Sequence, residues 1–229
     1  MTSVAPPPRP AAERWESPWD PSVDDRLCAR GWQRVRLLHQ MRRSLPLPDE
    51  LRDTTRSVAV SGFTTADTDG LLAVNNRAFS WHPDQGGWDR DRLTDRMAEP
   101  WFDPADLLIH HAEQASESLA QGDVDGFCWT KVHDTIDDDS THAASGDGPR
   151  RAAGEIFVIG TDPDMHGTGL GRALTVAGLD HLGAKGLSLA LLYVESDNAA
   201  AITLYERLGM AIHHSDAGYA RVSTVDTPS

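Results

Sequence analysis

The sequence predicts an α/β fold built on a mixed sheet, and two observations predict it. From Val58 onward, two helical patterns precede two strand patterns, and the rest of the chain then runs strand, helix, strand, helix. Early helices, antiparallel strands and a β-α-β-α run are together typical of a mixed sheet with helices on its faces. The 229 residues, 39% of them hydrophobic, suffice for one full domain and an appendage.

Each element follows from its periodicity and from the residues that break it. β-branched and aromatic runs bounded by Gly, Pro or Asp predict strands, and apolar residues at helical spacing predict helices. The predicted strands lie near 58–62, 106–111, 124–133, 155–161, 188–194, 211–214 and 217–223, and the predicted helices near 67–79, 88–97, 169–184 and 198–207. The long polar connection 134–152 predicts a disordered insertion between two strands.

The first 57 residues differ from this domain. Residues 1–22 are rich in proline and polar residues, so we expect them to be disordered. The segment 30–50, "RGWQRVRLLHQMRRSLPLPDE", alternates into a strand-like run that ends in a proline-bounded connector. We therefore expect 23–57 to be the end of another domain plus a linker, 58–222 to be the main domain, and 223–229 to be a tail.

Composition excludes several classes of function. The N-terminus has no apolar signal region, and no stretch approaches the roughly 18 apolar residues of a membrane span, so we expect a cytoplasmic protein without a membrane partner. Two distant cysteines, Cys28 and Cys128, predict neither a disulfide scaffold nor a metal site. The net charge of −14 disfavours nucleic-acid binding, because a phosphate backbone needs a basic face. We expect a monomer.

A glycine-rich elbow, "DPDMHGTGLGRAL" at 162–174, joins the strand "EIFVIG" to a predicted helix. Gly167, Gly169 and Gly171 let backbone N–H groups approach an anion closely, and the positive end of the helix adds attraction. Arg172 can add a cation. The elbow therefore predicts a phosphate site, with a plain strand-to-helix turn as the alternative.

Two common phosphate loops do not fit the elbow. A dinucleotide fingerprint needs its third glycine at Arg172, and a nucleotide P-loop needs Gly-Lys-Ser/Thr. The elbow instead resembles the [Gln/Arg]-x-x-Gly-x-[Gly/Ala] loop of the GCN5-related N-acetyltransferases, with His166, Gly169 and Gly171 in the three specified positions. His166 departs from the Gln or Arg of that family, which leaves the backbone cradle but puts a side-chain contact to the pyrophosphate in doubt.

A second segment, "LLYVESDNAAAITLYERLGM" at 191–210, resembles the other signature of this family. By themselves, Asn198 reads as a helix cap and Tyr205 as a core residue. The resemblance implies a mostly antiparallel sheet in which the central parallel strands "EIFVIG" and "LALLYV" splay around acetyl-CoA. The residues it implies for acetyl-CoA are Val158, Ile159, Gly160, His166, Gly167, Thr168, Gly169, Leu170, Gly171, Arg172, Asn198, Ala199, Ala200, Ala201, Ile202 and Thr203.

Acyl transfer to an amine needs a base, an oxyanion site and an acid for the leaving thiolate. Glu155 opens the strand beside the cofactor and is the candidate base, with a merely solvated carboxylate as the alternative reading. The resemblance places Tyr205 near the thioester sulfur as the candidate acid. Backbone N–H groups after Phe157 would hold the oxyanion.

Four segments together resemble the C-terminal domain of the mycothiol synthases: "NNRAFSWHPDQGGWDRDRLTDRMAEPWFDPADLLI", "GFCWTKVH", "GEIFVIGTDPDMHGTGLGRAL" and "LLYVESDNAAAITLYERLG". The resemblance implies acetylation of the cysteinyl amine of cysteinyl-glucosaminyl-inositol, a small-molecule amine. The implied substrate residues are Asp84, Lys131, Glu155 and Tyr193. Without the resemblance, Asp84 and Lys131 would be interpreted as charged surface residues. We expect Trp81, Trp88, Trp101 and Trp129 to serve packing.

Two alternatives stay open beside this reading. Those synthases have two acetyltransferase folds in tandem, and only about 23–48 resemble the end of the first one, which in the family supplies an acidic substrate contact and a second acetyl-CoA site. The chain is then either a shortened reading frame or a single-domain variant. The alternatives for its function are another N-acetyltransferase, acting on a protein N-terminus or small amine, and an acyl-CoA-binding remnant without turnover.

Overall fold

The computed structural model describes residues 11–82, 85–137 and 150–221. These residues form two compact units. The larger unit contains 42–80 and the described residues between 85 and 192, and the smaller one contains 11–41, 81–82 and 193–221. Each unit is described by itself.

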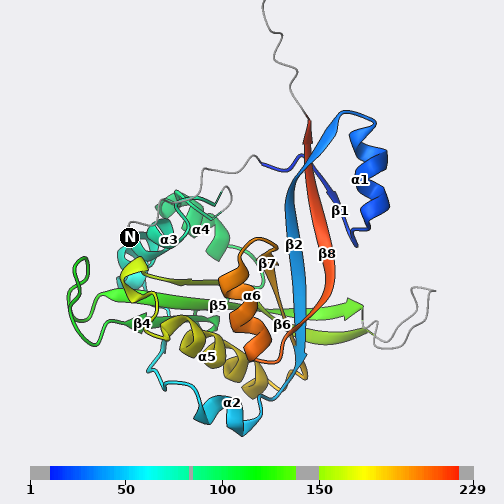
Figure 1. The fold of residues 1–229 in the computed structure, drawn as a ribbon. Coiled ribbons are helices and arrows are strands. Elements are labelled where there is room, and N and C mark those ends of the chain that lie inside the picture. Colours follow the sequence, from blue (N-terminus) through cyan, green and yellow to red (C-terminus); the bar gives the residue numbers. More distant parts are fainter. Residues whose placement is uncertain (1–10, 83–84, 138–149, 222–229) are drawn as a thin grey trace, which may run out of the picture. The chain divides into compact units, whose positions relative to one another are not determined.

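Five strands of the larger unit lie in the order β7-β6-β5-β4-β3 (Figure 1). They are β3 (Ser61–Gly62), β4 (Leu107–His111), β5 (Val124–Asp137), β6 (Arg150–Thr161) and β7 (Leu189–Glu195). The last three residues of β7 belong to the smaller unit. The pairs from β3 to β6 are antiparallel, whereas β6 and β7 are parallel. This arrangement confirms the predicted mixed sheet.

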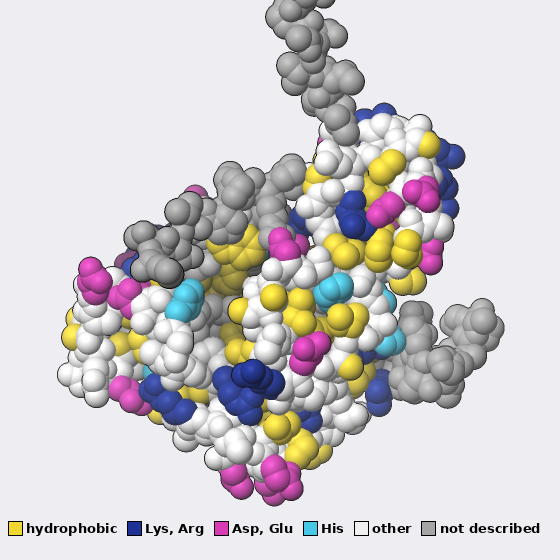
Figure 2. Space-filling model, viewed as in Figure 1, with side chains coloured by type: hydrophobic (Ala, Val, Ile, Leu, Met, Phe, Trp, Pro, Cys, Tyr) yellow, Lys and Arg dark blue, Asp and Glu magenta, His cyan; other side chains and the backbone are white. Residues whose placement is uncertain are grey.

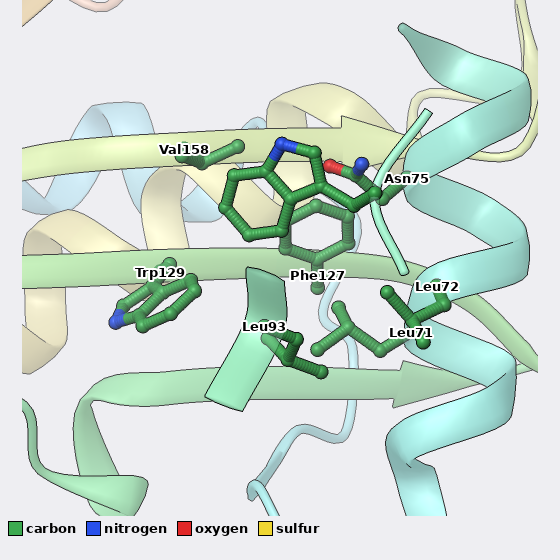
Figure 3. A pocket seen from close by; sticks show the side chains of 8 residues that line it. Leu71, Leu72, Asn75, Leu93, Phe127, Trp129 and Val158 are labelled. Carbon is green, nitrogen blue, oxygen red and sulfur yellow. The ribbon is translucent and has the colours of Figure 1, made fainter. Parts of the chain in front are cut away.

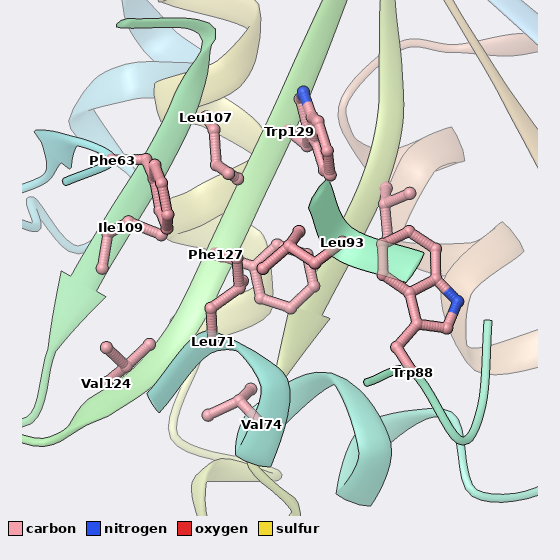
Figure 4. Packing of buried hydrophobic residues seen from close by; sticks show 11 residues of the cluster. Phe63, Leu71, Val74, Trp88, Leu93, Leu107, Ile109, Val124, Phe127 and Trp129 are labelled. Carbon is pink, nitrogen blue, oxygen red and sulfur yellow. The ribbon is translucent and has the colours of Figure 1, made fainter. Parts of the chain in front are cut away.

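Helices cover both faces of this sheet. On one face, α3 (Thr68–Ala78) and α4 (Arg90–Met97) contribute Leu71 and Leu93 to a core that also contains Phe127 and Trp129 of β5 (Figure 4). On the other face lies α5 (Leu170–Ala184), which approaches closely because Gly178 has no side chain: a Cβ there would lie 2.5 Å from the sulfur of Cys128. Successive residues of β5 therefore face different helices.

Short helices connect these elements. The chain enters the larger unit through the end of β2 (Trp32–Ser44) and α2 (Asp49–Asp53). Single 3₁₀ turns precede α3, β4 and the glycines of the elbow, at Thr65–Asp67, Pro104–Asp106 and Pro163–Met165. The last of these turns positions the glycines discussed below.

The smaller unit contains β1 (Arg14–Glu16), α1 (Pro21–Cys28), most of β2, α6 (Ala199–Arg207) and β8 (Ala211–Arg221). Its strands lie in the order β1-β8-β2. Tyr219 packs with Val23 and Leu27, and its hydroxyl donates to Asp24 over 2.5 Å. Burial, helped by that carboxylate, raises the pKa of Tyr219 to about 12. No helix among the described residues is long and apolar enough to cross a membrane.

The sequence-based boundaries were wrong in three places. Residues 11–22, predicted to be disordered, contain β1 and the start of α1, because β1 pairs with β8 some 200 residues away and local composition cannot reveal that partner. β5 and β6 extend into the predicted insertion, whose residues 138–149 lie outside the described ones. One strand, β8, replaces two predicted closing strands. The predicted domain limits at 58 and 222 stay a prediction.

Candidate active site

A β-bulge interrupts β6 in the centre of the larger unit. Trp129 pairs with Val158, but the next residue of β5, Thr130, pairs with Ile156, so Phe157 is the extra residue. The parallel ladder with β7 runs from Gly154 to Ile156, whereas β6 continues to Thr161. The backbone beyond the bulge is thus paired with β5 on one side, and a bulge re-aims N–H groups away from the regular ladder.

Glu155 lies immediately before this bulge and is buried, with 7% of its surface exposed. Its Oε2 lies 2.6 Å from Nε2 of His133 on β5. Sequence reasoning did not single out His133, although it follows Lys131 by two residues in "WTKVH" and strand periodicity places both on one face. Glu155 is therefore a buried, hydrogen-bonded carboxylate rather than a solvated one.

Lys131 is the residue directly opposite Glu155 in the β5–β6 ladder. Its Nζ lies 4.7 Å from the ring centroid of Trp101 and 5.8 Å from that of Phe157, and these two rings pack edge to face at 5.1 Å. Such ring faces attract an ammonium group and hold it in place. Trp129 is fully buried in the core, as the packing role predicted for it requires.

A small apolar hollow lies on the same face, between α3, α4 and strands β5 and β6 (Figure 3). Val158 and Trp129 contribute to its wall, so it adjoins the bulge. Its lining consists of Leu71, Leu72, Asn75, Trp88, Leu93, Phe127, Trp129 and Val158. Asn75 supplies the one polar side chain of this lining, and its Nδ2 donates to the Gln85 carbonyl over 2.6 Å.

The elbow at the other end of β6 is exposed from His166 to Gly169. Gly167 and Gly169 have φ of 79° and 85°, and no described atom outside their own neighbourhood lies within 4 Å of where a Cβ would be. Thr168 Oγ1 closes the turn by donating to the Met165 carbonyl over 2.7 Å. In the described part of the chain, the Gly167 and Gly169 N–H groups have no protein acceptor. These features suit an anion at the N-terminus of α5.

Arg172 does not extend along the elbow. Its Nε donates to Thr55 Oγ1 over 2.9 Å and its Nη2 to Thr54 Oγ1 over 3.4 Å, so its charge lies toward the segment after α2. On the face shown in Figure 2, Lys and Arg side chains form separate patches that alternate with Asp and Glu side chains. The polar backbone of the elbow is thus its principal feature for binding an anion.

A hydrogen-bond cluster ties the 3₁₀ turn of the elbow to the β4–β5 connection. Asp164 Oδ2 accepts hydrogen bonds from Ser116 Oγ at 2.9 Å, from Ser118 N at 3.0 Å and from Ser118 Oγ at 2.7 Å. Hydrogen bonds from Ser118 and then Ser116 lower the pKa of Asp164. The ionised carboxylate therefore anchors this connection to the elbow.

Several predicted site residues belong to the smaller unit. Asn198 Oδ1 accepts from the N–H of Ala201 over 3.1 Å and caps α6, whose Tyr205 is buried at 8% exposure. Tyr193 is 43% exposed, and its hydroxyl accepts from Gln40 Nε2 over 2.6 Å. Asp84 lies outside the described residues. The structure thus brings Glu155 and Lys131 together in the larger unit, whereas Tyr193, Asn198 and Tyr205 lie in the smaller unit.

The smaller unit also contains a buried ion pair that sequence reasoning missed. Arg36 of β2 and Glu195 of β7 lie 2.7 Å apart, with side chains 6% and 5% exposed. The Arg36 guanidinium also lies 5.3 Å from the ring centroid of Trp15. Arg36 and Glu195 are 159 positions apart, and no local pattern marks them as partners.

Comparison with known proteins gives consistent matches. Residues 76–210 match the acetyltransferase (GNAT) family. Two relatives named mycothiol acetyltransferase are those of Mycobacteroides abscessus, 44% identical over 88% of this chain and 61% of that protein, and of Segniliparus rotundus, 38% identical over 93% and 74%. A third, from Rhodococcus erythropolis, is 45% identical over 82% of this chain. The chain spans about 60% of the length of the first relatives it matches.

Solved structures show the same fold. A GCN5-related N-acetyltransferase from Sphaerobacter thermophilus aligns with a TM-score of 0.60 at 20% identity, over 87% of this chain and 56% of that one. A tandem GNAT protein from the clavulanic acid biosynthesis pathway aligns with a TM-score of 0.52 at 16% identity, over 91% and 61%. At these identities the likeness concerns the fold.

Proposed function

Because the chain belongs to the acetyltransferase (GNAT) family, we propose that it transfers the acetyl group of acetyl-CoA to a primary amine. One structural relationship supports this most strongly: β6 has a buried carboxylate and a bulge near its middle and an open, glycine-rich helix N-terminus after its end. From Glu155 to Thr161 a strand advances roughly 20 Å. An elongated cofactor with phosphates at one end and a thioester at the other fits along it.

The elbow would hold the phosphates of acetyl-CoA. Its free N–H groups and the positive end of α5 supply attraction that a chain of net charge −14 cannot supply by its overall field. Val158, Ile159 and Gly160 would bond the pantetheine arm through the backbone edge that β7 leaves open. The family resemblance also implies cofactor contacts for residues from Asn198 to Thr203, at the start of α6 in the smaller unit.

Residues around the bulge would carry the chemistry. The amine must lose a proton before it attacks the thioester carbonyl, and Glu155 is the base in our proposal. As the carbonyl carbon becomes tetrahedral, its oxygen gains charge, which the N–H groups re-aimed at Phe157 and Val158 would stabilise. The C–S bond then breaks and the departing thiolate takes up a proton, a role that the family resemblance implies for the Tyr205 hydroxyl of the smaller unit.

The relatives' name, mycothiol acetyltransferase, supports a role in mycothiol formation. The acceptor that the sequence resemblance implies is the cysteinyl amine of cysteinyl-glucosaminyl-inositol. An α-amine has a pKa of about 7.7 to 8.0, so a useful fraction is neutral near pH 7 and only modest help from a base is needed. Selection would therefore come from polar contacts: Asp84 for the ammonium, and Lys131 and Tyr193 for sugar and inositol hydroxyls. A site that bonds those groups rejects amines that lack them.

The test is release of free CoA by the purified chain with cysteinyl-glucosaminyl-inositol, cysteine or N-terminal peptides, followed by mass analysis of each product. We expect acetylation of the first amine to exceed that of the others by about 10²-fold or more in kcat/KM. A preference for peptides would contradict the acceptor. Saturable binding of acetyl-CoA without any acetylated product would instead identify a remnant that binds acyl-CoA.

A further inference from the structure

Acetylation of an ammonium leaves one proton over. The acceptor nitrogen loses two protons when its N–C bond to the acetyl group forms, and the leaving thiolate takes up one as the C–S bond breaks. The other proton must reach solvent, and it has to leave before the nitrogen can attack. A base as buried as Glu155 cannot pass it on unless a second group connects it to water.

From this geometry we infer that His133 is the proton exit of the site: it accepts from Glu155 the proton taken from the amine and releases it to solvent. The inference rests on the proposed function. His133 Nε2 and Glu155 Oε2 lie 2.6 Å apart, within the range of direct proton transfer. The Glu155 side chain is 10% exposed and that of His133 27%, so the imidazole is the wetter of the two.

The other charged side chains on this face of the sheet cannot take the proton. Lys131 stands opposite Glu155, Arg96 of α4 lies over the Phe157 ring at 5.6 Å, and strand periodicity places Arg151 of β6 on the same face as Glu155. Lysine and arginine side chains are donors without an acceptor atom. Among these neighbours, His133 is therefore the group that can accept a proton from Glu155.

Two of the three other histidine–carboxylate pairs described in the larger unit serve for comparison. His110 and Asp125 lie 2.5 Å apart, but their side chains are 2% and 0% exposed, so they have no contact with solvent. His181 lies 2.7 Å from Asp106, whose carboxylate is also bound by Lys185 at 2.5 Å. The His181–Asp106 pair has similar geometry and exposure and provides a matched control.

The experiment measures the single-turnover rate of amide formation at saturating acetyl-CoA, with cysteinyl-glucosaminyl-inositol or any amine that the wild type acetylates. His133→Gln can still hydrogen-bond to Glu155 through its side-chain amide but cannot relay a proton, and His133→Ala removes the hydrogen bond and the relay. We expect the rate of both variants to be about tenfold lower at pH 6.5. This loss is smaller than the roughly 10²- to 10⁴-fold loss that is typical of a missing general base. The deficit should shrink at about pH 8.5, where the amine is mostly neutral.

Added imidazole should raise the rate of His133→Ala and leave the rate of the His181→Ala control unchanged. His181→Gln should match the wild type. A wild-type rate in His133→Gln, or a deficit that neither imidazole nor higher pH reduces, would overturn the relay while leaving the proposed function intact. If the wild type acetylates none of the amines tested, the proposed function and the relay are both overturned. Circular dichroism and acetyl-CoA affinity verify that each variant is folded.

Discussion

Lys131 stands directly opposite Glu155 in the antiparallel ladder of β5 and β6, and its ammonium lies over the rings of Trp101 and Phe157. An ammonium held by ring faces in this way keeps free N–H bonds for a ligand. It also adds positive charge beside the proposed base. Lys131 is thus positioned to contact an acceptor that approaches Glu155.

We expect Lys131→Met to raise KM for the amine about tenfold while leaving the affinity for acetyl-CoA unchanged, because it removes contacts to the acceptor worth about one charged hydrogen bond. The chain has only one other lysine, Lys185, which pairs with Asp106. Lys185→Met is therefore the control and should leave KM unchanged. Steady-state kinetics with both variants would show equal KM values if Lys131 were only a packing residue.

Replacing Glu155 by glutamine tests the proposed base. Glutamine keeps the shape and can still accept a hydrogen bond from His133, but it cannot take a proton. We expect kcat to fall on the order of 10²-fold, with unchanged binding of acetyl-CoA by calorimetry. Full turnover of Glu155→Gln across neutral pH would mean that an amine arriving already neutral is sufficient.

Local patterns predicted the larger unit well. The strands β6 and β7, the elbow and α5 lie where periodicity and the glycines place them, because each is specified by its own side chains. The fold class and the family followed from these same segments. The resemblance implied Lys131 and Glu155 as substrate residues, and the two are paired in the ladder of β5 and β6; their contacts with a substrate stay predictions.

Contacts between distant segments could not be predicted. β1 depends on pairing with β8, and the bulge at Phe157 depends on the register between β5 and β6, which no single strand encodes. His133 was missed because the same register brings it to Glu155, although strand periodicity already places it on the face of Lys131. The hydrogen bonds of Arg172 to two threonine hydroxyls after α2 could not be predicted either, and its contact with the phosphates stays a prediction.

Asp164 should make the elbow sensitive to acid. Its pKa is lowered in the folded protein, so the stabilisation from its ionised form is present above its unfolded value, near pH 4, and is lost as pH falls through the folded value. We expect hydrogen exchange in residues 113–120 to be faster in Asp164→Asn than in the wild type at about pH 6. The difference should shrink as the pH falls below about 4. Equal exchange in the two proteins at pH 6 would contradict this anchor.

The conformation of Gly169 leads to the most direct test of the elbow. A side chain at φ of 85° costs roughly 1 to 2 kcal/mol in stability wherever it occurs, so a single variant cannot separate strain from loss of a ligand. Gly186, just beyond the other end of α5, provides the control. It has φ of 81°, and, as at Gly169, no described atom beyond its own neighbourhood would lie within 4 Å of an added Cβ.

Gly169→Glu and Gly186→Glu should therefore both lower the melting temperature, since both add the same backbone strain. Only Gly169→Glu places its carboxylate where the phosphates of acetyl-CoA would bind. We expect calorimetry to show an affinity at least about tenfold weaker for this variant, because like charges at a helix N-terminus compete for the same N–H groups. Equal affinities in the two variants would show that acetyl-CoA does not bind at the elbow.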